Sequence, residues 1–280
     1  MIDICTVVFK EELPILKLQA QSLGQYARNI GIRNIYVVIN DDIEIAKDID
    51  FEWYGELADN VALIPQGVFG ADLSTNGWLS QQLLKLLIAS MSHNVWTMAL
   101  DAKTILVQNL NISDLIDSLG RANVGVCPIQ PVFEPSKKIA EEIWEVQLDS
   151  QIGPAGVPFF FHNATVKSMM ADTFWRTGET FPNWFQKQGM LTEFICYSAY
   201  VKHMFNGFEK FYNTQSNIHP VNLCHSEYDI WDQKMQDMLR DDTTTVSIHR
   251  NAWSKATEEQ RDQYRKILCQ RGISWGEELK

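Results

Sequence analysis

Short apolar runs alternate with segments of helical pattern over the first hundred residues, and this alternation constrains the fold more than any other feature of the chain. The runs are almost continuously apolar, as is typical of strands that are covered on both faces. They lie at residues 4–9, 34–39, 61–64 and 95–100. Helical segments follow the first and third runs, near residues 11–31 and 78–92. This spacing predicts an α/β fold with a mostly parallel central sheet and right-handed crossover connections.

The second half of the chain is less regular. We expect helices at residues 113–120, 135–148, 192–204 and 257–272, and strands at residues 122–129 and 244–248. A segment rich in Trp, Gly and Pro, residues 174–189, is expected to form a loop. No clear linker or internal repeat interrupts the chain. The simplest division is therefore one domain over residues 1–250, with a C-terminal helical appendage over residues 251–280.

Composition and charge exclude several classes of function. The formal net charge is -11, whereas nucleic-acid binding needs a basic face that displaces counterions, so we expect no nucleic-acid partner. The apolar runs are too short to cross a bilayer, and the first residues lack the pattern of a secretory signal, so we expect no transmembrane segment. The five cysteines are widely spaced, which predicts buried free thiols in a reducing, cytoplasmic compartment.

Polar residues follow three of the predicted strands at the point where each strand ends. They are Lys10-Glu11, Asn40-Asp41-Asp42 and Asp101-Ala102-Lys103. In an open parallel sheet, ligands bind beyond the carboxyl ends of the strands. Each group alone is equally well explained as a solvated loop or a helix cap. Their coincidence at three strand ends favours a binding site at this edge of the sheet.

Asp101 is the sharpest of these residues. It directly follows the sequence Val-Trp-Thr-Met-Ala-Leu, a strand that looks buried throughout, so its carboxylate needs a cation, backbone donors or ligand hydroxyls as partners. Lys103 is a candidate partner or phosphate ligand. In the preceding helix, Trp78, Gln82 and Lys85 share one polar stripe, and the other faces are apolar. Such a stripe is expected either to face a polar cavity or to form a solvated edge.

The pattern Gly-Trp-x-x-Gln-Gln-x-x-Lys-Leu at residues 77–86, followed by Leu-Asp-Ala-Lys-Thr at residues 100–104, resembles a group of bacterial and phage glycosyltransferases with the GT-A fold. The resemblance is strongest over residues 1–110 and patchy over residues 150–250. It implies an enzyme that moves a sugar from a nucleotide-diphosphate donor, preferably a UDP-sugar, to a glycan or other hydroxyl acceptor. It also implies a nucleotide-binding half over residues 1–110 and an acceptor half over residues 111–250.

The same resemblance implies roles for individual residues of the donor site. The side chains that would bind the nucleotide-sugar are Thr6, Val8, Lys10, Asp41, Trp78, Gln82, Lys85, Asp101, Lys103 and Arg250. Thr6, Val8 and Lys10 would line the base, and Asp41 would hydrogen-bond the base or ribose. Lys85 and Gln82 would reach the phosphates or the donor sugar, and Arg250 would bind phosphate through its planar fork.

A divalent cation is the cofactor that the resemblance implies. Asp101 matches the first residue of the Asp-x-Asp element that holds Mn²⁺ or Mg²⁺ on the donor diphosphate, and His249 would be a second ligand. Lys103 occupies the place of the second Asp. Two outcomes therefore stay open: Lys103 itself neutralises the diphosphate without a metal, or Asp101 holds the metal with help from His249.

Inversion is the favoured stereochemistry, with retention as the alternative, and it needs a general base for the acceptor hydroxyl. Glu193, in the first turn of a helix, resembles the acid of a Glu-Phe-x-x-Tyr element in these enzymes, although it is equally well placed to stabilise the helix dipole. We expect Glu193 and Asp101 to be the catalytic residues, with Asp172 as a second candidate base. Trp175 and Trp184 are expected to stack on an acceptor sugar.

Two other functions share the same features. A sugar nucleotidyltransferase has the same kind of sheet and acidic rim, but it normally carries a glycine-rich basic loop after the first strand, whereas residues 10–14 are acidic and lack glycine. A catalytically silent GT-A domain that binds a nucleotide-sugar or a partner stays open, because the second Asp is missing. A dehydrogenase is excluded by the lack of a Gly-x-Gly-x-x-Gly fingerprint after the first strand.

Overall fold

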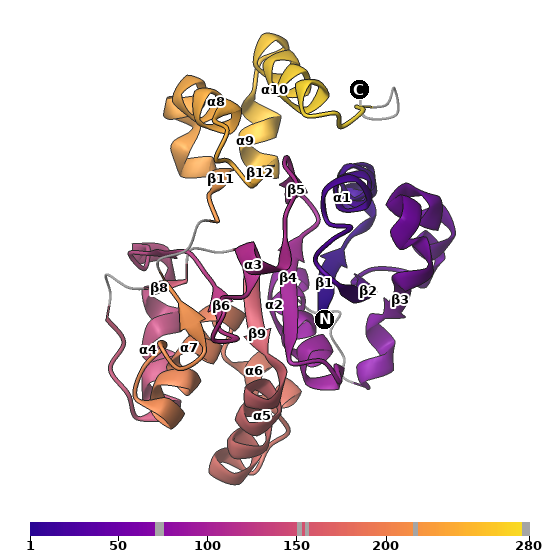
Figure 1. The fold of residues 1–280 in the computed structure, drawn as a ribbon. Helices are drawn as coiled ribbons and strands as arrows, with labels where there is room; N and C mark the ends of the chain where they lie inside the picture. Colours follow the sequence, from indigo (N-terminus) through magenta and orange to yellow (C-terminus); the bar gives the residue numbers. More distant parts are fainter. Residues whose placement is uncertain (71–75, 150–152, 155–156, 215–217, 276–280) are drawn as a thin grey trace.

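A five-stranded sheet lies at the centre of the structure, a computed structural model that describes residues 1–70, 76–149, 153–154, 157–214 and 218–275. The strand order is β3-β2-β1-β4-β9 (Figure 1). Four strands are parallel, and β9 joins β4 as an antiparallel edge strand. Their bounds are Ile2–Val8 for β1, Ile32–Ile39 for β2, Val61–Pro65 for β3, Trp96–Asp101 for β4 and Phe159–His162 for β9. The predicted α/β fold with a mostly parallel sheet is confirmed.

Helices cover the sheet because its two central strands are apolar on both faces. All seven residues of β1 are buried, as are the first five of β4. The main covering helices are α1 (Leu13–Tyr26), α2 (Gly77–Met91), α5 (Asn163–Thr177) and α7 (Glu193–Phe205). Asn76 caps α2 by accepting a hydrogen bond from the Leu79 backbone N–H at 3.1 Å. Ten residues of α2 are buried. The expected, nearly fully buried helix before β4 is thus confirmed.

Shorter elements connect these layers. The short helices are η1 (Lys10–Glu12), η2 (Ile43–Asp48), η3 (Phe51–Asn60), η4 (Gln66–Phe69), α3 (Ile112–Leu115), η5 (Pro131–Phe133), α4 (Glu134–Trp144) and α6 (Phe181–Lys187). Four two-residue strands form two small sheets. In one, β6 (Ala122–Asn123) pairs with β10 (Tyr212–Asn213), and in the other, β7 (Val126–Cys127) pairs with β8 (Gly153–Pro154). The single strand expected at residues 122–129 is therefore wrong, because the chain changes partner between β6 and β7.

The loop expected over residues 174–189 is also wrong. Helix α5 continues to Thr177, and α6 occupies Phe181–Lys187. Phe181, Trp184 and Phe185 are buried in α6, with the spacing of one helical face, and Pro182 stands in the first turn, where proline is tolerated. The Trp- and Pro-rich composition of this segment concealed a short amphipathic helix.

A second, smaller hydrophobic core lies beyond the central sheet (Figure 1). It contains a three-stranded sheet of order β11-β12-β5, in which β12 pairs parallel with β11 and antiparallel with β5. We call the elements of this core the C-terminal module: β5 (Ile105–Leu106), β11 (Pro220–Leu223), η6 (His225–Ile230), α8 (Trp231–Leu239), β12 (Thr245–Ile248), α9 (Arg250–Lys255) and α10 (Glu258–Gln270). The expected boundary at residue 250 falls inside this module.

Two bulk expectations can be compared with the structure. No helix among the described residues is long and apolar enough to cross a membrane. All five cysteines are free thiols, as expected. Cys5 and Cys196 are buried, and burial raises the pKa of each thiol to about 12. Cys269 is exposed, which differs from the expectation that all the thiols are buried.

Candidate functional site

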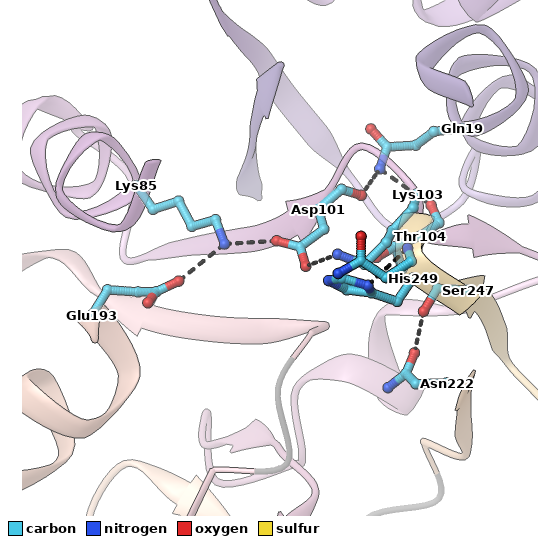
Figure 2. Close-up of polar contacts among 10 residues, drawn as sticks. Gln19, Lys85, Asp101, Lys103, Thr104, Glu193, Asn222, Ser247 and His249 are labelled. Carbon is cyan, nitrogen blue, oxygen red and sulfur yellow. Dashed lines mark hydrogen bonds and ion pairs between the residues drawn. The ribbon is translucent and has the colours of Figure 1, made fainter. Parts of the chain in front are cut away.

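A cluster of buried charges surrounds Asp101 at the carboxyl end of β4. Nζ of Lys85 lies 2.7 Å from Oδ1 of Asp101 and 2.9 Å from Oε1 of Glu193. On the other carboxylate oxygen, Nζ of Lys103 lies 2.9 Å from Oδ2. Figure 2 shows Lys85 and Glu193 on one side of the Asp101 carboxylate, and Lys103 and His249 on the other. The structure thus brings together four predicted site residues from α2, β4 and α7.

Burial decides how the members of this cluster can act. The side chains of Lys85 and Glu193 are 2% and 1% exposed, whereas those of Asp101 and Lys103 are 21% and 25% exposed. The Gln82 amide satisfies its neighbours when its nitrogen faces Glu193, where it donates to Oε1 at 3.1 Å. Lys85 and Gln82 of the expected polar stripe of α2 therefore face a polar interior. Of the two alternatives given by the sequence, a polar cavity and a solvated edge, the first applies to these residues. Only Asp101 and Lys103 offer surface to a ligand.

The pKa values of the cluster follow from this geometry. Burial alone would raise the pKa of the Asp101 carboxyl, but the ammonium groups of Lys103 and Lys85 outweigh it and hold the pKa well below its usual range. Burial lowers the pKa of Lys85, but Asp101 and Glu193 outweigh that effect and raise it. Burial raises the pKa of Glu193 by more than Lys85 lowers it. Asp101 is therefore a persistent anion and a weak base.

Residues 101–104, which we call the Asp101 turn, are held in place by Gln19 of α1. The Thr104 backbone N–H donates to the Asp101 carbonyl at 2.8 Å and closes the turn. Nε2 of Gln19 donates to the carbonyls of Asp101 and Thr104, at 2.5 and 3.1 Å (Figure 2). Oε1 of Gln19 in turn accepts from the Thr6 hydroxyl at 2.9 Å. A buried polar chain thus fixes the turn that carries Asp101 and Lys103.

The C-terminal module supplies the opposite wall of the site. Val246 of β12 pairs with Ile105, which directly follows the Asp101 turn, and the strands are antiparallel. Continuing this register brings the end of β12, and hence His249 and Arg250, towards the turn. Arg250 is exposed, and it lies close enough to Glu12 to lower the pKa of that carboxyl, which burial nevertheless raises overall. Lys103 and Asp101 act on the same carboxyl, so Glu12 also borders the site.

The first two strand ends are tied to each other and to α2. The Lys10 backbone N–H donates to Oδ2 of Asp41 at 3.0 Å, and together with the Asp42 N–H it lowers the pKa of the Asp41 carboxyl. Asn40 donates to the Gly77 carbonyl at 3.1 Å and accepts from the Ser80 hydroxyl at 3.0 Å. Two of the three expected rim segments, those after β1 and β2, are therefore joined to each other and to the start of α2.

Other predicted residues lie in different surroundings. Thr6 and Val8 are fully buried within β1, and the structure leaves neither side chain a surface for a ligand. Trp78 is 40% exposed in the first turn of α2, so it is accessible. Asp172 accepts from the Tyr200 hydroxyl at 2.6 Å, two helical turns along α7 from Glu193, so it lies outside the cluster.

The expected aromatic platform for an acceptor is divided between the surface and the core. Trp175 is 81% exposed near the end of α5, whereas Trp184 is a buried residue of α6. A cavity of about 410 Å³ lies in the same region, between the start of α2 and α6. Most of its wall is polar: Asn76, Leu79, Ser80, Asn183, Gln186, Lys187 and Gly189. Ser80 stands five residues before Lys85 on α2, which is about 7.5 Å along the helix axis.

The described side chains do not form a ready site for the expected divalent cation. Both oxygens of Asp101 accept from lysine ammonium groups, and Nδ1 of His249 accepts from the Asn251 backbone N–H at 3.2 Å. Across the described ranges, no three His, Cys, Asp or Glu side chains are grouped so that they could hold a metal ion. Hard cations prefer several oxygen ligands that are not already paired with positive charge.

Two residues of the site were not identified from the sequence. Gln19 lies in the middle of a helix that shows a general apolar pattern, so nothing local marks it as a support of Asp101. Glu12 follows the rim residues Lys10 and Glu11 and was not itself assigned to the site, whereas Asn40 was expected in the polar rim. Gln19 could have been found from the sequence in one way: it is a polar residue on a helix face where an apolar residue is expected, and the structure shows that it is fully buried.

Comparisons with known proteins agree on the fold. A family model described as "Family of unknown function (DUF6492)" matches residues 5–263. No curated protein matches the chain. Among solved structures, the WbbM bifunctional glycosyltransferase has a TM-score of 0.53 at 11% identity; the match covers 99% of this chain and 51% of WbbM, so the chain spans about half the length of that protein.

Two other glycosyltransferases match less closely. Galactosyltransferase LgtC, in complex with donor and acceptor sugar analogs, has a TM-score of 0.49 at 13% identity over 94% of this chain and 95% of LgtC. Mouse xyloside xylosyltransferase 1 has a TM-score of 0.46 at 12% identity over 88% of this chain and 97% of its own. The central sheet and flanking helices thus have the GT-A glycosyltransferase fold that the sequence predicted.

Proposed function

The chain belongs to the family of unknown function DUF6492, and we propose that it is a glycosyltransferase that moves a sugar from a nucleotide-diphosphate donor to a hydroxyl acceptor. The observation that carries the proposal is the Asp101 cluster. It places an accessible lysine, Lys103, at the carboxyl edge of a parallel sheet, where α/β folds bind their ligands. A UDP-sugar is the favoured donor, and a glycan hydroxyl is the favoured acceptor.

The proposed reaction is a displacement at the anomeric carbon of the donor sugar. The acceptor oxygen forms a bond to that carbon, and the bond from the carbon to the diphosphate oxygen breaks with its electron pair on the leaving nucleoside diphosphate. The acceptor hydroxyl gives its proton to a base. Negative charge grows on the leaving group, so fixed cations at that point lower the barrier. Lys103, which is partly exposed, and Arg250, which is exposed, are two cations of the site that would supply this stabilisation.

The nucleotide is proposed to lie over the ends of β1 and β2. Lys10 is exposed there, and the Asp41 carboxylate already accepts two backbone N–H groups, which keeps it ionised. An ionised carboxylate is a suitable acceptor for ribose or base donors. Because Thr6 and Val8 are enclosed, we assign the base contacts to the strand ends rather than to the strand interior.

Burial changes the role that we assign to Glu193. A general base must approach the proton that it accepts to within hydrogen-bond distance, and Glu193 is only 1% exposed. We propose that Glu193 acts through Lys85, which it holds against Asp101. Inversion needs a base that reaches the acceptor hydroxyl, and Glu193 is enclosed, so the configuration of the product is to be measured. The proton NMR coupling of the anomeric hydrogen distinguishes inversion from retention.

The acceptor is proposed to enter the cavity beside α6. Its volume of about 410 Å³ falls within the range of small-molecule sites, and amide groups such as those of Asn183 and Gln186 suit sugar hydroxyls. The cavity lies in the segment where the sequence predicted acceptor contacts. Amides contribute to the polar wall, whereas Trp184 is buried in α6 and does not line the cavity.

The competing functions fit the site less well. A sugar nucleotidyltransferase needs a flexible basic loop after β1, but residues 10–12 form the helical turn η1, which leads directly into α1. A silent donor-binding domain shares every feature of the donor side. Turnover separates it from an enzyme, because only an enzyme releases free nucleoside diphosphate from the donor.

The proposal is tested by thermal unfolding in the presence of UDP- and GDP-sugars. A donor at about 100 times its Kd adds about 2.7 kcal/mol to the free energy of unfolding. For a chain of this size, that is a rise in Tm of about 5 °C. A panel in which no nucleotide-sugar raises the Tm, with or without Mn²⁺, contradicts the proposal.

An Asp101→Ala variant tests the assigned site. Loss of the carboxylate releases Lys103 and leaves the Lys85–Glu193 pair, so we expect donor binding and turnover to be lost while circular dichroism stays native. A matched control is Asp242→Ala, an exposed carboxylate paired with Arg240 in the C-terminal module. Full activity of Asp101→Ala would rule out this site.

A further inference from the structure

By the resemblance to the Asp-x-Asp element, the Asp101 turn would hold a divalent cation, but the structure places the ammonium group of Lys103 against its carboxylate. We infer that this protein binds the donor diphosphate through Lys103 and Arg250 without a divalent cation, and that Asp101 positions Lys103 instead of coordinating a metal. This inference rests on the proposed function. It assigns a chemical class of ligand, an uncomplexed diphosphate, to the accessible side of the cluster.

The first support is the state of the Asp101 carboxylate. Lys85 occupies Oδ1 at 2.7 Å and Lys103 occupies Oδ2 at 2.9 Å, so both oxygens are already paired with positive charge. A divalent cation at Oδ2 would have to displace the Lys103 ammonium and then remain near it. Both steps are opposed by the repulsion between like charges at a partly buried position.

The second support is the asymmetry between the two lysines. Lys85 is enclosed between Asp101 and Glu193, with Nζ 5.3 Å from the centroid of the Phe194 ring, so it cannot leave without uncovering two carboxylates. Lys103 is 25% exposed and has one carboxylate partner. When Lys103 turns towards a phosphate, Asp101 keeps the ion pair with Lys85. The cluster can thus offer one cation to a ligand without leaving a buried charge unpaired.

The third support is the position of a second exposed cation. The register between β12 and β5 brings Arg250 to the edge of the Asp101 turn, and both Arg250 and Lys103 act on the Glu12 carboxyl. A diphosphate carries about two negative charges near neutral pH, and two cations on neighbouring walls match that charge. The planar guanidinium can also bind two phosphate oxygens at once.

The experiment measures UDP-sugar binding by isothermal titration calorimetry, in excess EDTA and in excess Mn²⁺. We expect the wild-type Kd to agree within about twofold between the two conditions. Binding that requires Mn²⁺ overturns the inference and leaves the proposed function standing. Absence of binding under both conditions overturns the proposed function together with the inference.

Substitutions at Lys103 sharpen the experiment, because a carboxylate there restores an Asp-x-Asp element. Lys103→Asp is expected to weaken binding in EDTA by at least tenfold, which is about 1.4 kcal/mol, and to recover affinity when Mn²⁺ is added. Lys103→Met is expected to weaken binding equally, without recovery by Mn²⁺, and Lys103→Arg is expected to retain it. Lys47→Asp, at an exposed lysine of η2, controls for the change in net charge. Unchanged EDTA binding by Lys103→Asp would refute the role of Lys103.

Discussion

Nζ of Lys85, in the middle of α2, lies 2.7 Å from Oδ1 of Asp101, the last residue of β4. This ion pair connects the helix that precedes the strand to the end of the strand itself, sixteen residues later. Because Lys85 is 2% exposed, its charge depends entirely on its two carboxylate partners. The position of Asp101 at the edge of the sheet therefore depends on ion pairs that are buried inside the protein.

Removal of the Lys85 charge should destabilise the fold strongly. A Lys85→Met variant keeps the length of the side chain but leaves Glu193 buried without its cation, and breaking a buried pair in this way costs about 3–5 kcal/mol. Urea denaturation measures the loss. Lys47→Met, which breaks an exposed pair with Glu44, should cost no more than about 1 kcal/mol. Equal losses in the two variants would contradict the argument.

The pH dependence of stability should carry the signature of Asp101. Its pKa in the folded state is depressed by Lys103 and Lys85, so the ionised carboxylate stabilises the fold above its unfolded pKa of about 3.9. That contribution is lost as the pH falls from about 4 towards the folded pKa. We therefore expect the free energy of unfolding of Asp101→Asn to fall less steeply than that of wild type below about pH 4.

Glu193 provides an internal comparison of opposite sign. Burial raises the pKa of Glu193 in the folded state, so its contribution to stability is present below its unfolded pKa of about 4.3 and is lost as the pH rises through the folded value. Glu193→Gln should therefore gain stability relative to wild type as the pH increases over that range. If both variants follow the wild-type curve, the charge cluster does not titrate as described.

The support of the Asp101 turn by Gln19 predicts a loss of both stability and turnover. Gln19→Leu removes the donor to the carbonyls of Asp101 and Thr104. The Asp101 carbonyl still accepts from the Thr104 N–H, but the Thr104 carbonyl loses its partner, and an unsatisfied buried carbonyl costs about 1–3 kcal/mol. We expect kcat to fall as well, since Lys103 is carried by the same turn. Gln21, on the same helix, has a buried side-chain oxygen that accepts no hydrogen bond from the described residues. Gln21→Leu should therefore be close to neutral in urea denaturation and in steady-state assays.

The cavity beside α6 predicts a separation of the two substrates in kinetics. Gln186→Ala removes an amide from its wall, so the KM for the acceptor should rise several-fold while the KM for the donor stays the same. Gln233→Ala, at an exposed position on α8, is the control. An equal change in both KM values would show that the cavity belongs to the donor side or acts only through folding.

The parts of the fold that the sequence predicted are those in which the local pattern and the final environment agree. The central strands β1 and β4 are buried on both faces, and their apolar runs show it, whereas the edge strand β3 is half-buried. Asp101 stood out because a carboxylate at the end of such a strand needs partners. One partner, Lys103, could be predicted because it is a neighbour of Asp101 in the sequence. The Lys85–Glu193 contact, which completes the cluster, joins residues 108 positions apart and could not be predicted.

The failures have physical reasons as well. In α6 the pattern of Phe181, Trp184 and Phe185 was helical, but the neighbouring prolines and glycines were given more weight. The C-terminal module was foreseen only in part. The strand at residues 244–248 and the last helix were expected and correspond to β12 and α10. Strand β5 has two residues and pairs with β12 over more than a hundred positions, so the separate sheet that they form had no local signal. Gln19 shows the same limit, since its role depends on carbonyl groups 82 and 85 positions away.

The Asp101 turn has one more consequence, for how this chain can be divided. Strand β4 ends in the large core and β5 begins in the small one, so the four residues of the Asp101 turn form a joint between the two cores. Removing the chain from residue 218 onwards would uncover Leu18, Ile105 and Val107, which pack in the small core. A shortened protein would therefore lose one wall of the Asp101 site, and the C-terminal module has to be kept in any variant that is used to test the proposed function.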